Sequence, residues 1–210
     1  MHPLLDFRTM DDKHKFFFTK VFELYNKYGI KSVTMDDVSR ELGISKKTLY
    51  ECISDKSELV KHVMQMMFTL HGEKLAQISK SGLNAMEELL EVNRLMSTMV
   101  KDLNQTLLYD LRKYYPELYH DMMSEQFGKM HDAVRQNLIK GQQEGLYRKD
   151  MNVDIISKLH MIRMDYHLSH DALMPGNLES EDTMREIFIY HLHGIASENG
   201  LKLLNEKLNQ

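Results

Sequence analysis

The feature that most constrains the fold is a run of short amphipathic segments arranged around a single glycine. The run covers residues 33–59 and reads VTMDDVSRELGISKKTLYECISDKSEL. Its apolar side chains recur at helical spacing on both sides of Gly43. Glycine can end a helix in the left-handed conformation because it has no Cβ to clash. This layout predicts a helix-turn-helix over about residues 34–53.

Capping residues support these helix starts. Thr34 precedes the first apolar run and stands three residues before Asp37, which is the spacing of a capping box. Ser45 is placed to cap the second helix, and Ser54 or Asp55 to cap a longer helix that follows. The stretch therefore predicts two short helices and the start of a third.

Lysines occupy helix starts where acids are normally favoured. Asp36 and Asp37 obey the rule in the first helix, but Lys46 and Lys47 open the second and Lys56 opens the third. A cation there makes physical sense if it binds a phosphate together with the free N–H groups. The alternative is solvated surface lysines, each costing only roughly a few tenths of a kcal/mol. Three such lysines favour a second helix that enters the major groove of DNA.

Further residues extend the pattern on both sides of the motif. The matching positions are Phe17, Val21, Leu24, Tyr25, Gly29, Thr34 through Val38, Leu42 through Tyr50, Lys56 and Leu59. With them, the segment from about residue 11 to 70 resembles the DNA-binding domain of the tetracycline-repressor (TetR) family of transcriptional regulators. The run Ser-Lys-x-Thr-Leu-Tyr, followed six residues later by Lys, is typical of that family.

The resemblance implies an all-α chain of about nine helices. A three-helix helix-turn-helix DNA-binding domain is expected over residues 1–60, and a helical effector-binding and dimerisation domain over residues 61–210. Beyond the motif, helical periodicity predicts helices over about 56–79, 84–101, 103–113, 116–143, 153–171 and 181–207. No strand pattern or internal repeat is present in the sequence.

The resemblance also implies DNA contacts for seven residues. Thr34, Tyr50 and Lys56 would hold phosphates, while Ser45, Lys46, Lys47 and Thr48 would lie at the groove. Two positions depart from the family pattern. Cys52 replaces an aromatic residue or histidine that touches the backbone, and Ile53 replaces a phenylalanine of the small core. We expect Ile53 to fill that core with a smaller side chain.

Charge and composition narrow the function. The chain has 210 residues, 42% hydrophobic and 28% charged, which is globular. The net charge is −4, and the first sixty residues carry ten basic and ten acidic side chains. A few lysines are therefore expected to share one face while the acids point elsewhere. No membrane span or secretory signal is found, and one cysteine excludes an internal disulfide, so a cytoplasmic location is expected.

The last two helices are expected to pair with those of a second copy, as the resemblance implies. The candidate interface residues are Ile155, Ile156, Leu159, Ile162, Ile187, Phe188, Leu192 and Ile195. The alternative is packing within one subunit, and both are expected to hold in part. A dimer would read two half-sites ~34–36 Å apart on a near-palindrome.

Seventeen methionines suggest an adaptable cavity for a small-molecule effector. The candidate lining is Met64, Met67, Phe68, His71, Met96, Met99, Leu108, Tyr109, Phe127, Met130, Met161 and Met164. The alternative is an ordinary core.

Nothing in the sequence suggests catalysis, a cofactor or a metal. His167 and His170 lie three apart, and His191 and His193 follow later, but a metal needs three or four converging ligands. The chain is thus expected to be a homodimeric regulator, a repressor that a small molecule releases from a palindromic double-stranded operator. The alternatives are an architectural DNA-binding protein without an effector, and a helical enzyme or metal-binding bundle.

Overall fold

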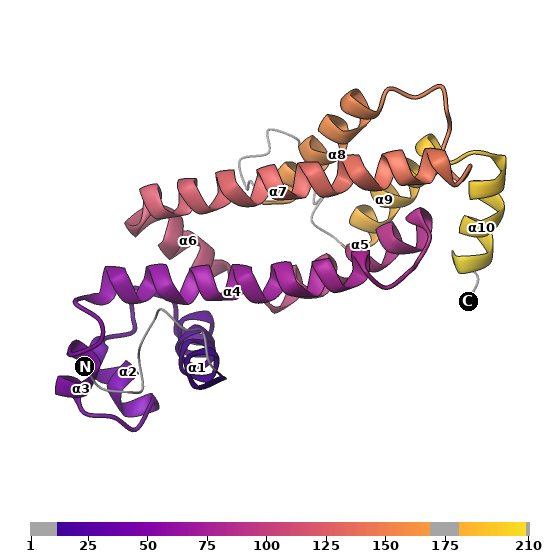
Figure 1. Cartoon of the computed structure of the whole chain (residues 1–210). Coiled ribbons are helices and arrows are strands. Elements are labelled where there is room, and N and C mark those ends of the chain that lie inside the picture. Colours follow the sequence, from indigo (N-terminus) through magenta and orange to yellow (C-terminus); the bar gives the residue numbers. More distant parts are fainter. Residues whose placement is uncertain (1–11, 169–180, 209–210) are drawn as a thin grey trace. The chain divides into compact units, whose positions relative to one another are not determined.

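The structure is a computed structural model that describes residues 12–168 and 181–208, and in these ranges the chain is helical (Figure 1). The ten helices are α1 (Asp12–Tyr28), α2 (Met35–Glu41), α3 (Lys46–Tyr50), α4 (Lys56–Ser79), α5 (Ala85–Asp102), α6 (Gln105–Tyr114), α7 (Pro116–Gln143), α8 (Val153–Leu168), α9 (Glu181–Ile195) and α10 (Glu198–Leu208). The all-α class is confirmed. The end of the predicted helix 153–171 lies outside the described residues.

The prediction of a single helix over 181–207 is wrong, because the helix is interrupted at Ala196 and Ser197, between α9 and α10. Ala196 forms an isolated antiparallel bridge with Tyr147, and the Ser197 amide donates to the Leu146 carbonyl at 2.9 Å. The Ser197 hydroxyl then accepts the Gly200 amide at 3.2 Å and so caps α10. Apolar periodicity continues through the break, so the sequence pattern conceals it.

The chain divides into two compact units. The first comprises residues up to Gln77 together with Arg94–Met123, and the second comprises Ile78–Asn93 together with the chain from Ser124 onward. This division places all of α1, α2, α3 and α6 in the first unit. The functional boundary near residue 60 stays a prediction.

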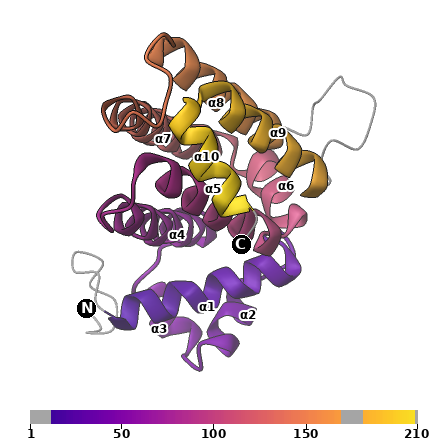
Figure 2. The same ribbon diagram turned by 90° about the vertical axis from the view of Figure 1, so that its right-hand side faces the viewer.

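The first unit has a core shared by the three amino-terminal helices, the beginning of α4, and α6. In it α1 contacts α2 and α6, while α2 contacts α3 (Figures 1 and 2). Its fully buried side chains are Val21, Tyr25, Ile30, Leu49, Ile53, Leu59, Val60, Val63 and Leu107. The predicted helix-turn-helix is thus one wall of a larger core rather than a free-standing domain.

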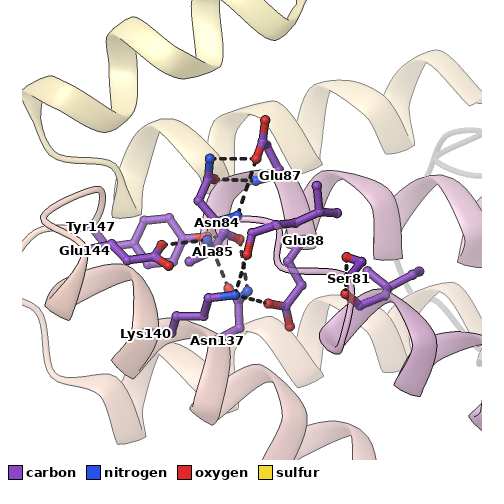
Figure 3. Close-up of polar contacts among 11 residues, drawn as sticks. Ser81, Asn84, Ala85, Glu87, Glu88, Asn137, Lys140, Glu144 and Tyr147 are labelled. Atoms are coloured by element: carbon purple, nitrogen blue, oxygen red, sulfur yellow. Dashed lines mark hydrogen bonds and ion pairs between the residues drawn. The ribbon is translucent and has the colours of Figure 1, made fainter.

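The second unit is organised around the start of α5 (Figure 3). The Ala85 carbonyl accepts from the Asn137 side-chain amide at 2.9 Å, and the Tyr147 hydroxyl lies 3.0 Å from the same oxygen. The Ala85 amide donates to the Glu144 carboxylate at 2.7 Å, and the Lys140 ammonium lies 2.8 Å from Glu88 of α5. Burial raises the pKa of Tyr147, which therefore stays neutral as a hydrogen-bonding core residue.

Candidate nucleic-acid interface

A capping box fixes the start of α2. The Asp37 amide donates to the Thr34 hydroxyl at 3.2 Å, and the Thr34 amide donates to the Asp37 carboxylate at 2.9 Å. These bonds from Thr34 hold the pKa of Asp37 below its usual value. The predicted capping box is confirmed.

The turn to α3 needs Gly43, whose φ of +65° lies in the left-handed region. After the turn, Ser45 caps α3 by accepting the Thr48 amide at 3.0 Å. The Ser45 and Thr48 hydroxyls are also 2.8 Å apart. Both polar side chains that were predicted at the groove therefore take part in holding the helix start.

The α3 helix has one buried face and one open face. Leu49 and Ile53 have 0% exposure and anchor the helix and the residues after it in the core. Lys46 and Lys47 are exposed, and Tyr50 is 47% exposed. The expectation that Ile53 fills the core is confirmed. The neighbouring Cys52 is half-buried, and this burial raises the pKa of its thiol. The open face is therefore basic and aromatic.

The lysines of this face differ in their surroundings. Lys46 forms an ion pair with Asp36 at 2.5 Å, because the turn brings the start of α2 beside the start of α3. The expectation that the acids point away from the basic face is therefore wrong for Asp36. Lys47 has no ion-pair or hydrogen-bond partner within the described ranges. It is thus free to contact an external anion.

Lys56, at the start of α4, is held against the loop that follows α1. Its ammonium lies 3.3 Å from the Lys31 carbonyl oxygen, and partial burial lowers its pKa. Asp55 caps α4 by accepting the Glu58 amide at 2.9 Å, which confirms one of the two predicted caps. Lys56 therefore sits on a fixed backbone at the edge of the motif.

Sequence reasoning missed the supporting role of α6. The buried Asp110 carboxylate accepts the Lys31 amide at 2.8 Å, and the Lys31 ammonium lies 4.9 Å from the Tyr114 ring. The one local signal was Gly29, with φ of +80° and only 2.9 Å between a built Cβ and the Asp110 Oδ2 atom. A glycine shows that something approaches, but not what.

The predicted effector-cavity residues are divided between the two units. Met64, Met67, Phe68, His71, Met96, Met99, Leu108 and Tyr109 belong to the first unit, and Phe127, Met130, Met161 and Met164 to the second. Met64 is buried, whereas Tyr109 is 55% exposed. Met164 lies in α8, but its side chain is outside the described part. A common cavity for these residues stays a prediction.

A different cleft of about 510 Å³ lies in the first unit, where α4 begins and α6 meets α7. Its lining residues are Asp55, Ser57, Glu58, Lys61, Tyr114, Tyr115, Pro116, Glu117 and Leu118. None of the predicted cavity residues belongs to it. Burial raises the pKa of Tyr115, and the Glu58 carboxylate is occupied by the Ser54 amide at 2.6 Å.

The predicted dimer residues fall into two groups. Ile155, Leu159 and Ile162 are exposed by 63%, 52% and 66% and form one stripe of α8. Phe188, Leu192 and Ile195 are instead buried in the core of the second unit. Ile156 and Ile187 are half-buried.

No cluster of three or more metal-ligating side chains occurs among the residues that the structure describes. His170 lies outside them, as does the side chain of His167. His191 is buried against His160, and His193 is exposed. None of the helices in the described ranges is long and apolar enough to cross a membrane.

The fold and the open face of α3 define a helix-turn-helix DNA-binding protein. The sequence model described as "Bacterial regulatory proteins, tetR family" matches residues 22–63, which contain the whole motif. Residues 22–63 therefore carry a tetR-family DNA-binding domain, and the predicted resemblance is confirmed.

Several curated relatives match part of the chain. The uncharacterized HTH-type transcriptional regulator YvaF of Bacillus subtilis (strain 168) is 31% identical over 101 residues, which cover 46% of this chain and 50% of YvaF. The HTH-type transcriptional regulator SAUSA300_2515 of Staphylococcus aureus (strain USA300) is 25% identical over 107 residues, covering 46% of this chain and 58% of that protein. The chain thus spans about half the length of the curated relatives it matches.

Solved structures match more of the chain at lower identity. A transcriptional regulator from Cytophaga hutchinsonii has a TM-score of 0.66 at 20% identity, covering 89% of this chain and all of that one. A putative transcriptional regulator from Saccharomonospora viridis, solved in complex with choline, has a TM-score of 0.66 at 16% identity. The match covers 90% of this chain and 100% of that one. At these identities the likeness shows the fold alone.

Proposed function

We propose that this chain is a homodimeric transcriptional repressor that binds a palindromic DNA operator and leaves it when a small molecule binds. The observation that carries the proposal is the open face of α3, where Lys47 has no partner among the described residues and Leu49 is anchored in the core. A rigid helix with an unpaired cation on its outer side suits the major groove. Such a function belongs in the cytoplasm, where the DNA is.

Each DNA contact has a distinct task in this proposal. Lys47 reaches the O6 and N7 atoms of guanine and so reads sequence. Thr34, Tyr50 and Lys56 hold phosphates and set the register without reading bases. Lys46 joins them when a phosphate displaces Asp36, its present partner. Ser45 and Thr48 lie beside the groove and keep α3 in shape.

The exposed stripe of α8 supports dimerisation. Ile155, Leu159 and Ile162 follow helical spacing, and Tyr190 of α9 is 82% exposed in the same unit. Soluble proteins seldom leave large apolar side chains grouped in water unless a partner covers them. We assign the stripe to a second copy, while Phe188 and its buried neighbours stabilise each subunit.

Release by a small molecule requires a difference in free energy between two states. Relieving a promoter a thousandfold needs about 4 kcal/mol of differential binding. Displacing the two recognition helices supplies enough, because one good base contact is worth ~1–3 kcal/mol. The structural neighbour from S. viridis was solved in complex with choline, so a protein of similar fold binds a small molecule, which supports an effector site in this chain. An effector would act through α4, which begins directly after the helix-turn-helix.

The direct test is selection of bound DNA from a random pool by the full chain. A palindrome with half-sites one helical turn apart is the expected product. Lys47→Ala should weaken binding to that sequence about 10- to 100-fold and relax its base preference. Lys56→Ala should weaken all DNA about equally, and Lys149→Ala, an exposed lysine of the second unit, should change nothing. Selection of no common sequence would point to an architectural DNA-binding protein instead.

The dimer is tested separately by sedimentation of Leu159→Glu. A carboxylate in the apolar stripe should convert the protein to monomers and abolish binding to the palindrome. Lys158→Glu changes charge at an exposed neighbouring position and serves as the control. A Leu159→Glu protein that remains dimeric would remove α8 from the interface.

A further inference from the structure

The second unit contains a buried polar cluster between α8 and α9. His160 Nδ1 lies 3.1 Å from His191 Nε2, and the two rings meet edge to face with centroids 4.9 Å apart. Arg163, one turn after His160, has a terminal nitrogen 3.4 Å from His160 Nε2. Its guanidinium lies 5.3 Å from the centre of the Phe188 ring. Neither histidine is more than 8% exposed.

Donor chemistry fixes the direction of these contacts. A guanidinium can only donate, so His160 must accept at Nε2 and carry its proton on Nδ1. His160 then donates from Nδ1 to His191 Nε2, and His191 in turn carries its proton on Nδ1. Both imidazoles are thus neutral. In agreement, burial lowers the pKa of His160 to about 2 and that of His191 to about 4.

The arginine lacks a compensating charge. Its Nε atom is buried without a hydrogen-bond partner, and no carboxylate pairs with Arg163 among the described residues. Burial lowers its pKa to about 10, so the group is still a cation at neutral pH. A partly buried charge without a carboxylate partner is costly, and the reduced dielectric around it makes the guanidinium a strong partner for an anion.

We propose that Arg163, positioned by the neutral imidazoles of His160 and His191, is the receptor for the anionic head group of the effector, either a carboxylate or a phosphate. This inference rests on the proposed function and names the chemical class of its ligand. The free Nε–H of Arg163 and a terminal N–H form the fork that such head groups accept side by side. The imidazoles, fixed as neutral groups, add no competing charge.

Apolar residues at the same level of α7 and α8 as the cluster suggest an apolar tail on the ligand. His131 of α7 lies 3.1 Å from Ser157 of α8, and Arg135 pairs with Asp154 at 2.8 Å. The two helices therefore run antiparallel. One turn before His131 in α7, Phe127 lies at the level of His160 and Met161, one turn after Ser157 in α8. These are residues that the sequence predicts for the effector cavity. Phe127 and Met161 are half-buried, and methionine adapts its shape to a ligand.

The test compares four probes that share an eight-carbon chain: octanoate, octyl phosphate, octan-1-ol and octylamine. Binding to the full chain is measured by calorimetry and thermal shift at pH 7.5. At least one of the anions should bind ten or more times tighter than the alcohol, and the amine should not bind. Whichever anion binds more tightly identifies a carboxylate or a phosphate as the natural head group. Equal binding of anion and alcohol would overturn the proposal.

Variants connect the preference for anions to the arginine. Arg163→Met should abolish the preference, and Arg163→Lys should keep part of it because the charge remains. Arg185→Met, at an exposed arginine of α9, is the matched control. Without ligand, Arg163→Met should raise the melting temperature, because an apolar group replaces an uncompensated charge. A lowered melting temperature together with unchanged anion binding would show that Arg163 is a structural residue paired within the chain.

Operator binding separates this inference from the proposed function. If the protein selects a palindrome and dimerises but shows no preference for anions, only the receptor proposal fails. If it selects no palindrome and still binds the anion through Arg163, the repressor proposal fails and the receptor proposal holds.

Discussion

Hydrogen bonds at the helix starts of the helix-turn-helix join residues three positions apart, such as Asp37 with Thr34 and Thr48 with Ser45. In the second unit, the bonds at the start of α5 join Ala85 to residues 52 and 62 positions away. The first region is shaped by local capping and the second by long-range packing. Local shape allows α3 to present a regular face to DNA, whereas long-range packing creates buried polar sites such as the Arg163 cluster.

The largest effect that would separate the two regions is a change at Gly141. A Cβ built there would lie 2.0 Å from the Tyr147 ring. The position of a Cβ is fixed by the backbone, so an alanine cannot avoid this clash by rotating its side chain. Gly141→Ala should therefore lower the free energy of unfolding by about 3 kcal/mol or more, measured by urea denaturation. Gly128→Ala, on the same helix with no atom within 4 Å of the built Cβ, should instead stabilise the protein by up to ~1 kcal/mol. Equal stabilities of the two variants would contradict this packing argument.

The same contrast explains which parts of the structure could be predicted. The capping box at Thr34, the turn at Gly43 and the cap at Ser45 were all predicted, because each depends on residues a few positions apart. The break at Ala196 and the role of Asp110 were not, because their partners lie about fifty or more positions away. Sequence periodicity indicates that a face is buried, but not which segment covers it.

The candidate sites follow the same division. The DNA-contact residues came from a local motif, and the structure places all seven in or beside the helix-turn-helix. The effector-cavity residues were chosen by residue type, and the structure distributes them over both units. Sequence reasoning considered His191 only as a possible metal ligand. In the structure His191 is instead hydrogen-bonded to the buried His160, which is 31 positions away in the sequence.

Acid should weaken both regions, because burial lowers the pKa of His71 in the first unit and of His160 and His191 in the second. The folded-state pKa of His191, about 4, lies below the ~6.5 of an unfolded chain, so only the unfolded state binds a proton between these values. The contribution of neutral His191 to the free energy of unfolding is therefore fully present above about pH 6.5 and decreases as the pH falls towards 4. The lowered pKa values of Asp37 and Glu58 have their effect only below about pH 4, where unfolded carboxylates take up protons.

Melting temperatures between pH 7.5 and 5 measure this acid sensitivity. His191→Gln should make the profile less steep, because the unfolded chain loses one of the buried-histidine proton sites behind the decline, while His160 keeps another. His193→Gln, on the exposed side of the same helix, should leave the profile as it is in the unmodified protein. Identical profiles for His191→Gln and the unmodified protein would mean that the buried pair does not control stability in this range.

The smallest effect concerns the ion pair between Lys46 of the DNA-reading face and Asp36 of α2. Asp36 is about half-exposed and pairs with Lys46, so removing its charge should cost little stability. Asp36→Asn should free Lys46 for phosphate and strengthen binding to random DNA by about two- to fivefold, as expected for ~0.5–1 kcal/mol of released pairing. The logarithmic dependence of affinity on salt should also steepen by about one unit. Glu51→Gln is the matched control, because Glu51 is an exposed acid just after α3 whose side chain has no partner within the described ranges. If both variants gain equally, the gain reflects net charge, and Asp36 does not restrain Lys46 in particular.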